Sequence, residues 1–378
     1  MDKPFNYGTL ASGDYFTNRE KETQRLINNF NLGINTVLIS PRRWGKSSLV
    51  LKAAQETIKK EKKIKIAFLD LFAVRTEEEF YNYYASTLIK AASSVWDEKI
   101  ELMRKVFKTV IPKVNLSPDP TADIAFSLNW EEIKKKPDEI LDLAENLCIA
   151  KNIKIVVCID EFQNISQFDS GNLLIKKLRS FWQKHTRASY CLYGSKRNMM
   201  LTLFENKGSA FYKFGDLILL HKIETQYWIP YIQLRFKATG KQISAEQAEA
   251  IALAMENHPY FVQQLALEVW YLTKETTAVN FLEEAIAELT IKNNILYQKE
   301  LESLSSTQIG FLKAIIDGAQ NFTSIEVLGK YKLGTAGNVK RIREALIHKE
   351  IIDFTGKKYE ILDPVFKIWF RKNLMDSN

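Results

Sequence analysis

The sequence predicts an α/β core with a parallel sheet, then a helical segment, then a C-terminal winged helix. Three observations support this fold class. Over residues 34–195, short apolar runs alternate with longer amphipathic stretches, the pattern of parallel strands joined by crossover helices. Residues 223–300 carry apolar side chains at helical spacing. From residue 305 onward, three helix-like segments precede a short strand pair, which is the order of a winged helix.

Four short apolar segments are the predicted strands of the sheet. They are Asn35–Ser40, Ile64–Leu71, Ile153–Ile159 and Ser189–Tyr193. Residues 112–130 hold three prolines and two alternating apolar–polar runs, so we expect an inserted β-hairpin there.

The remaining elements are predicted to be mainly helical. In the last part of the chain, helices are expected up to Ile316, around Ser324–Tyr331 and over Thr335–His348, followed by a hairpin that turns at Thr-Gly-Lys-Lys. We therefore expect an α/β core over residues 1–220, a helical lid over 221–302 and a winged helix over 303–378.

Composition limits the class of protein. An apolar fraction of 46% fits a packed globular chain, and a net charge of +8 favours anionic partners such as nucleotides, nucleic acids or acidic membranes. Residues 305–378 hold 12 Lys and Arg against 8 Asp and Glu, which is half of the surplus. The three cysteines have no Cys-x-x-Cys spacing, which argues against a disulfide framework and a zinc site. Without an 18-residue apolar run or a signal-like N-terminus, we expect a cytoplasmic protein and no membrane partner.

The segment after the first strand has the residue types of a phosphate-binding loop. It reads Ser-Pro-Arg-Arg-Trp-Gly-Lys-Ser, a Walker A pattern with serine in place of the first glycine. Gly45 lets backbone N–H groups point at the β-phosphate, Lys46 neutralises the β and γ oxygens, and the Ser47 hydroxyl ligates Mg²⁺. An exposed basic turn is the alternative, but the position between an apolar strand and a helix favours phosphate binding. The residues expected to bind ATP here are Ser40, Pro41, Arg42, Arg43, Trp44, Gly45, Lys46, Ser47 and Ser48.

A second apolar strand ends in two acids, as a Walker B motif does. Asp160 is expected to hold the magnesium ion, and Glu161 to orient the attacking water or take its proton. An acidic turn at a strand end is the alternative for this pair alone. Together with the loop, the pair predicts an ATPase that cleaves the β–γ phosphoanhydride with ATP and Mg²⁺ as cofactors.

Further segments resemble the archaeal-type ATPase family of prokaryotes, within the AAA+-related STAND group of P-loop NTPases. The resemblance covers nearly the whole chain and is carried by Phe16–Glu20, Ser40–Arg43, Gly194–Arg197, His258–Tyr260 and Asp363–Phe366. It implies an AAA+-like sheet with a helical lid and a winged helix.

The resemblance also implies roles for residues outside the two Walker motifs. Phe16 and Arg19 match a segment that lies against the adenine, although Asn18 could also simply cap a helix. Ser195 is placed as the sensor 1 residue, on a strand between those carrying the Walker motifs, where its hydroxyl could touch the γ-phosphate or the lytic water. His258 and Pro259 match a lid turn that reports the bound nucleotide, or they form a helix cap. No arginine is placed convincingly as a finger acting across subunits.

The winged helix offers a candidate contact to DNA. Lys340, Arg341 and Arg343 fall within one turn of its expected recognition helix, where basic side chains could hold phosphates. Glu344 and Glu350 interrupt this patch, and a charged helix face is commonly only solvated.

The resulting functional hypothesis is a STAND-like regulatory ATPase whose turnover drives a switch passed to the winged helix. The alternative is an ATP-dependent DNA-binding regulator that uses the winged helix, favoured by the basic C-terminal part. A small-molecule kinase is disfavoured, because the long C-terminal tail serves no purpose in it, and intact Lys46, Asp160 and Glu161 disfavour a non-hydrolysing scaffold. We expect ATP and ADP as ligands, and any output enzyme to be a partner protein on another chain.

Overall fold

The computed structural model describes residues 3–93, 98, 101–102, 105–107, 113–115, 125–127, 130–355 and 358–376. The chain forms two compact units. One spans Arg19–His221, and the other combines the residues up to Asn18 with those from Lys222 onward. The N-terminal segment was expected in the α/β core, and it instead packs with the C-terminal unit. There Phe5 lies edge-on to Tyr231 and Phe236.

The unit Arg19–His221 is built on a parallel five-stranded sheet, which confirms the predicted fold class. The strands are β1 (Thr36–Ile39), β2 (Ile64–Asp70), β5 (Lys154–Asp160), β6 (Ala188–Gly194) and β7 (Asp216–Leu219). Their order is β2-β5-β6-β1-β7, and every neighbouring pair is parallel. Strand β7 was not predicted, because its four residues carry too little pattern to separate them from a loop.

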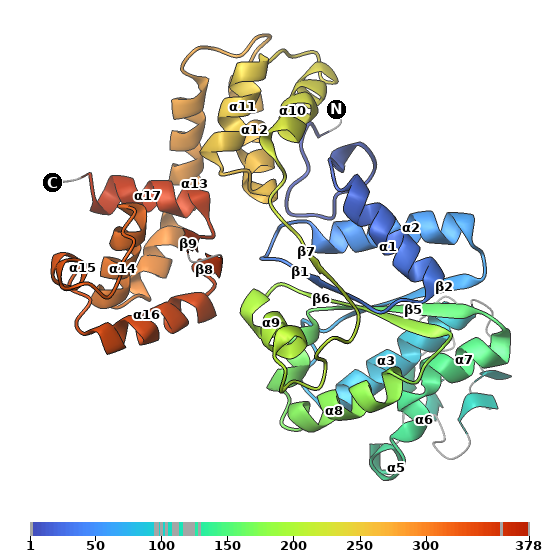
Figure 1. The fold of residues 1–378 in the computed structure, drawn as a ribbon. Coiled ribbons are helices and arrows are strands. Elements are labelled where there is room, and N and C mark those ends of the chain that lie inside the picture. The colour runs from blue at the N-terminus through green and yellow to red at the C-terminus, as the bar shows by residue number, and fades with distance from the viewer. Residues whose placement is uncertain are drawn as a thin grey trace. The chain divides into compact units, whose positions relative to one another are not determined.

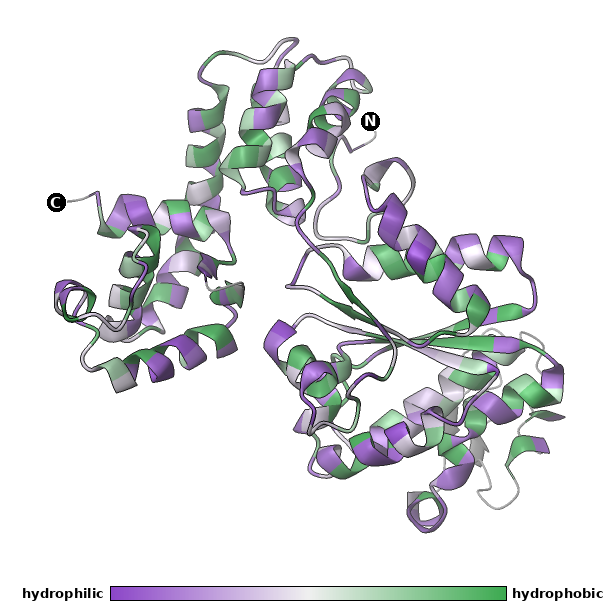
Figure 2. Ribbon diagram, in the orientation of Figure 1, coloured by the Kyte–Doolittle hydropathy of each residue, from purple (hydrophilic) through white to green (hydrophobic). Residues whose placement is uncertain are grey.

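Helices cover both faces of this sheet (Figure 1). Helices α1 and α2 lie on one face, and α3, α7 and α8 lie on the other. The helices whose bounds the structure describes in this unit are α1 (Glu20–Leu32), α2 (Lys46–Lys60), α3 (Glu77–Ala92), α5 (Trp130–Lys135), α6 (Asp138–Leu141), α7 (Leu143–Lys151), α8 (Gly171–Trp182) and α9 (Arg197–Glu205). Colouring by hydropathy shows hydrophobic central strands and hydrophilic residues on the outer sides of the helices (Figure 2).

Burial of apolar and aromatic side chains holds this unit together. Strands β1 and β6 are buried along their whole length, as expected of strands with helices on both faces. Trp182 of α8 stacks on Tyr190 of β6 with ring centroids 4.0 Å apart.

Between α3 and α5, β3 (Lys113–Asn115) pairs antiparallel with β4 (Ala125–Ser127) inside the segment where a hairpin was expected.

The second unit contains the helical segment and the winged helix, in the predicted order. The helical segment consists of α10 (Thr225–Lys237), α11 (Ala245–Ala254), α12 (Pro259–Leu272) and α13 (Phe281–Glu302). The winged helix, also confirmed, consists of α14 (Ser306–Ile316), α15 (Ile325–Lys330), α16 (Ala336–His348), β8 (Ile352–Thr355), β9 (Lys358–Ile361) and α17 (Pro364–Leu374).

The helical segment and the winged helix share one hydrophobic core. Tyr297 of α13 packs edge-on against Phe366 of α17 at 5.4 Å and lies 5.7 Å from Trp369. The Tyr297 hydroxyl donates to Asp363 at 3.1 Å, and the Trp369 indole donates to Asn294 at 2.8 Å. Helix α13 therefore belongs to the helical segment and also packs against the winged helix. The predicted boundary near residue 302 falls at the end of this helix.

In the described part of the chain, no helix is long and apolar enough to cross a membrane.

Candidate functional site

The sheet topology brings the predicted nucleotide-binding residues to one edge. Because the strands are parallel, their carboxyl ends lie together, and this edge is where ligands bind in open α/β sheets. The phosphate loop follows β1, Asp160 ends β5, and Ser195 follows β6. Strand β6 lies between β1 and β5, so Ser195 stands between the two Walker motifs, as the resemblance implied.

The phosphate loop has the backbone that its residues predict. Gly45 has φ +91° directly before α2, and a Cβ there would meet no atom within 4 Å, so the positive φ rather than space favours glycine. Arg43 also has a positive φ of 64°. The Lys46 side chain is buried, and its Nζ donates to the carbonyl oxygens of Ser40 at 2.9 Å and Pro41 at 3.0 Å. The loop thus curls around its own lysine at the start of a helix, which suits an anion.

The two predicted magnesium ligands are in direct contact. The Ser47 hydroxyl donates to Asp160 Oδ2 at 2.6 Å. A hydroxyl and a carboxylate oxygen are hard donors of the kind Mg²⁺ prefers, and such a site takes its other ligands from water and phosphate. Among the described residues there is no cluster of three or more His, Cys, Asp or Glu that could hold a metal, so this pair offers a partial rather than a complete coordination shell.

Burial changes the protonation of Asp160. Removal from water, together with the neighbouring Glu161 charge, raises the pKa of Asp160 to about 6, although the Ser47 hydroxyl, the Glu161 N–H and the Lys46 charge favour the ionised form. A cation placed beside this carboxylate would lower its pKa again.

Glu161 is held firmly by one carboxylate oxygen. Its backbone has φ +51°, and its Oε2 accepts hydrogen bonds from Ser195 Oγ at 3.0 Å, Ser195 N at 3.2 Å and Gln163 Nε2. Burial alone would raise the pKa of Glu161, but the bonds from Gln163 and Ser195 and the Lys46 charge bring it below the ordinary value. The side chain is therefore an ionised carboxylate at neutral pH.

Ser195 links this carboxylate to the phosphate loop. It is buried, and its hydroxyl also lies 3.4 Å from Nε of Arg42, which donates to it. Arg42 and Arg43 are otherwise exposed at the loop, and Trp44 is half-buried. Lys46, Ser47, Asp160, Glu161 and Ser195 thus form one connected site.

Gln163 is a residue of this site that sequence reasoning missed. It lies in a 3₁₀ helix, Phe162–Gln167, and is completely buried. The only available signal was its position two residues after Glu161, and that spacing predicts no contact in itself.

The other predicted nucleotide contacts are distributed over both units. Arg19 belongs to the unit of the sheet. It has φ +76°, is buried, and donates through Nη2 to the His221 carbonyl at 2.5 Å. Burial lowers the pKa of its guanidinium, which still carries its charge. Phe16, His258 and Pro259 belong to the other unit, so their contact with nucleotide stays a prediction.

His258 and Pro259 do form a helix cap. His258 Nδ1 accepts from the Tyr260 N–H at 3.2 Å, and Pro259 is the first residue of α12. This local role needs no ligand and is compatible with the predicted one.

The predicted DNA contacts lie on α16. Lys340 and Arg341 are exposed, whereas Arg343 is half-buried with its guanidinium 5.9 Å from the Phe354 ring centroid. Lys340 lies 3.9 Å from Glu344, a weak exposed pair that reduces its local charge.

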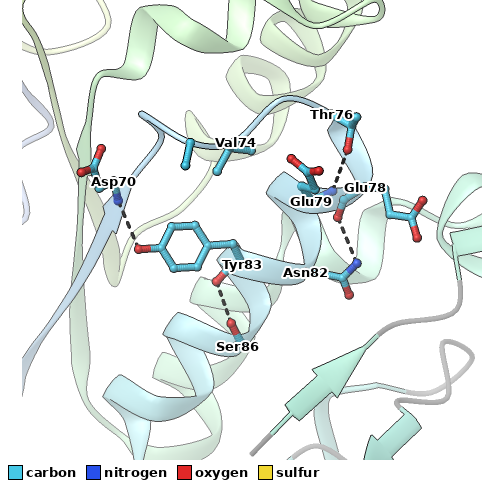
Figure 3. Close-up of a pocket in the computed structure, with 9 residues that line it drawn as sticks. Asp70, Val74, Thr76, Glu78, Glu79, Asn82, Tyr83 and Ser86 are labelled. Carbon is cyan, nitrogen blue, oxygen red and sulfur yellow. Dashed lines mark hydrogen bonds between the residues drawn. The ribbon is translucent and has the colours of Figure 1, made fainter. Parts of the chain in front are cut away.

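A cavity of about 830 Å³ lies beyond the end of β2, where Asp70 is in register with Asp160 (Figure 3). Its polar groups are largely engaged in local structure. The Thr76 hydroxyl caps α3 by accepting from Glu79 N, and the Asp70 N–H donates to the Tyr83 hydroxyl. The remaining lining comes from Ala73, Val74, Glu78, Asn82 and Ser86.

Comparisons with known proteins identify the family and support the fold. Residues 16–229 match the family described as ATPase domain predominantly from Archaea, and residues 295–372 match a probable winged helix domain. The chain is similar to a solved Walker-type ATPase of Pyrococcus abyssi, with a TM-score of 0.64 and 18% identity over 96% of this chain and 97% of that one. It is also similar to the Aeropyrum pernix ORC2 protein in its ADPNP–ADP complexes, with a TM-score of 0.54 and 13% identity over 97% and 98%. These two likenesses show the fold alone. No curated protein sequence matches the chain.

Proposed function

Because the chain belongs to the family of ATPase domains found predominantly in Archaea and carries a C-terminal winged helix, we propose that it binds ATP with Mg²⁺ and hydrolyses the β–γ phosphoanhydride. The observation that carries the proposal is the contact of Ser47 with Asp160 at 2.6 Å, with the ionised Glu161 beside it. Two metal ligands and a base gathered at one edge of a parallel sheet are what this hydrolysis requires.

Each side chain has a defined task in this mechanism. Lys46 balances charge on the β and γ oxygens, and the N–H groups at the start of α2 bind phosphate. Ser47 and Asp160 would hold a magnesium ion, which when bound would supply charge neutralisation at the phosphates. Glu161 orients the attacking water and takes its proton, and Ser195 places a hydroxyl next to that water or the γ-phosphate.

We further propose that turnover drives a STAND-like conformational switch. The chain passes between its two units only at residues 18–19 and 221–222. Arg19 and His221 are the residues at these two crossings that belong to the unit of the sheet. The Arg19 guanidinium donates to the His221 carbonyl, so this hydrogen bond links the two crossings. Because the helical lid and the winged helix share one core, a movement at these crossings would carry them as a single body.

Hydrolysis of ATP by the purified chain tests the enzymatic part. Glu161→Gln should lower kcat by about 10²- to 10⁴-fold while leaving ADP affinity within a few-fold, because the amide keeps the shape and loses the base. Lys46→Ala should weaken nucleotide binding itself. Glu78→Gln, a matched change at an exposed position, should alter neither. Turnover that survives both changes in the phosphate site would contradict the proposal.

A second candidate function is ATP-dependent DNA binding, favoured by exposed Lys340 and Arg341 on α16. If it holds, duplex affinity should fall steeply with salt, and neutralising Lys340, Arg341 and Arg343 should flatten that dependence. Duplex binding that is absent at low salt would leave a switch triggered by a protein or small ligand.

A further inference from the structure

The Glu161 carboxylate is bonded asymmetrically. All three donors, Gln163 Nε2, Ser195 N and Ser195 Oγ, converge on Oε2. Among the described residues, none donates to Oε1. A carboxylate oxygen with three donors has its lone pairs occupied, so the second oxygen is the one left to accept a proton.

Gln163 supplies one of these donors in an arrangement that is unfavourable for folding. Its side chain is completely buried, and its amide oxygen Oε1 has no hydrogen-bond partner among the residues that the structure describes. The opposite orientation of the amide would place a carbonyl oxygen against an ionised carboxylate, which is repulsive, so the NH₂ group faces Glu161. A buried acceptor left unsatisfied is unfavourable for folding and in a native protein calls for an explanation.

Gly194 makes the room that Gln163 needs. A Cβ on Gly194 would lie 1.9 Å from Gln163 Oε1 and 3.1 Å from Met200 Sδ. Gly194 does not have a positive φ, so close approach rather than backbone conformation excludes a side chain here. Gly194 is the last residue of β6 and directly precedes Ser195. Gly194 therefore leaves space for the Gln163 amide, and the next residue, Ser195, provides the other two donors to Glu161.

We propose that Gln163 is a positioning residue that, together with Ser195, anchors Oε2 of Glu161 and thereby makes Oε1 the proton-accepting oxygen. This inference rests on the proposed ATP hydrolysis. Gln163 acts through Glu161, to which its Nε2 donates. A carboxylate free to rotate would spend less time in the orientation that the attacking water requires, and rate depends steeply on such placement.

The test is a kinetic comparison of Gln163→Leu and Gln163→Met with wild type. Both changes remove the NH₂ donor without adding a charge, and methionine keeps about the length of the side chain. We expect kcat to fall about 10- to 100-fold in each, with KM and ADP affinity within about threefold of wild type. Gln183→Leu, the same change at an exposed glutamine of the same unit, is the matched control and should leave kcat unchanged.

A double-mutant cycle separates positioning from a structural role. In the Glu161→Gln background, single-turnover hydrolysis should lose less than about twofold more on adding Gln163→Leu, because the anchored carboxylate is already gone. An additional loss as large as that in the wild-type background would overturn the proposal, and so would wild-type kcat in both Gln163 variants.

These outcomes are distinct from failure of the proposed function. If the wild-type chain does not hydrolyse ATP, both proposals fall. If wild type is active, Glu161→Gln is inactive and the Gln163 variants match wild type, only the positioning role is wrong. Should Gln163→Leu unfold the chain, as a thermal melt would show, Gln163→Met and the cycle built on it decide the question.

Discussion

At the scale of single residues, two neighbouring half-buried carboxylates have pKa values shifted in opposite directions. Partial burial and the adjacent Glu161 charge raise the pKa of Asp160 to about 6, whereas hydrogen bonds from Gln163 and Ser195 lower the pKa of Glu161. The difference follows from the number of hydrogen bonds that each carboxylate accepts. A third acid, Glu145 of α7, uses the same principle for stability alone.

Glu145 ties α7 to the start of β6. It accepts hydrogen bonds from the N–H groups of Thr186, Arg187 and Ala188, at 2.8 Å for the last, and from the Thr186 hydroxyl. Burial opposes ionisation, yet these bonds lower its pKa. The stabilisation is therefore complete above the pKa of a glutamate in the unfolded chain, about 4.3, and is lost as pH falls through the lower folded value.

We predict that Glu145→Gln reduces the free energy of unfolding by about 1–2 kcal/mol at pH 7, since one charged acceptor of several N–H groups is replaced by an amide. The deficit should shrink as pH falls below about 4.3. Urea unfolding of wild type and variant between pH 3 and pH 7 measures it. A deficit that is constant with pH, or equal to that of exposed Glu78→Gln, would show that the carboxylate is not stabilising.

At the scale of elements, the cap of α17 also contacts another helix. Asp363 caps α17 by accepting from the N–H groups of Val365 at 2.8 Å and Phe366 at 2.9 Å, and its other oxygen accepts from the Tyr297 hydroxyl of α13. One carboxylate thus fixes both the start of α17 and its contact with the lid.

We predict that Asp363→Ala destabilises the C-terminal unit by about 2–3 kcal/mol, because it removes a helix cap worth about 1 kcal/mol and leaves the Tyr297 hydroxyl without its acceptor. Asp363→Asn keeps the capping oxygen and should cost less. Thermal unfolding gives both values. Equal losses in the two variants would mean that the charge, rather than the cap, carries the effect.

At the scale of the whole molecule, the chain divides into two units. One unit is a continuous segment, whereas the other combines the N-terminal residues with the C-terminal part of the chain. The helical segment and the winged helix, which are separate in the sequence, share one hydrophobic core to which α13 contributes. Trp369 is a central part of this core, buried between Tyr297 and Phe366 with its indole bonded to Asn294.

We predict that Trp369→Ala destabilises the lid together with the winged helix, by about 3–5 kcal/mol, because it opens a cavity in their shared core. Hydrogen exchange should show faster opening in α12 and α13 as well as in α14 and α17. Leu296→Ala, at a position of α13 with 60% of its surface exposed, serves as the control and should have little effect. Faster exchange confined to the winged helix would show that the two segments open independently.

The sequence by itself determined the elements and the residues whose signals are local. The phosphate loop, the acid pair at the end of β5 and the three helices before the wing each depend on a few neighbouring residues, so spacing and residue type were enough to locate them. Strand β7 was missed because four residues, of which three are apolar, are too few to show a period.

Tertiary structure alone decided which distant residues meet. The N-terminal 18 residues join the C-terminal unit through Phe5, and Arg19 bonds to a carbonyl about two hundred positions away. Gln163 reaches Glu161 only because Gly194, on another strand, leaves space for it. Such contacts depend on how helices and strands pack across the sheet, and packing is set by the combined shape of many side chains rather than by any local pattern.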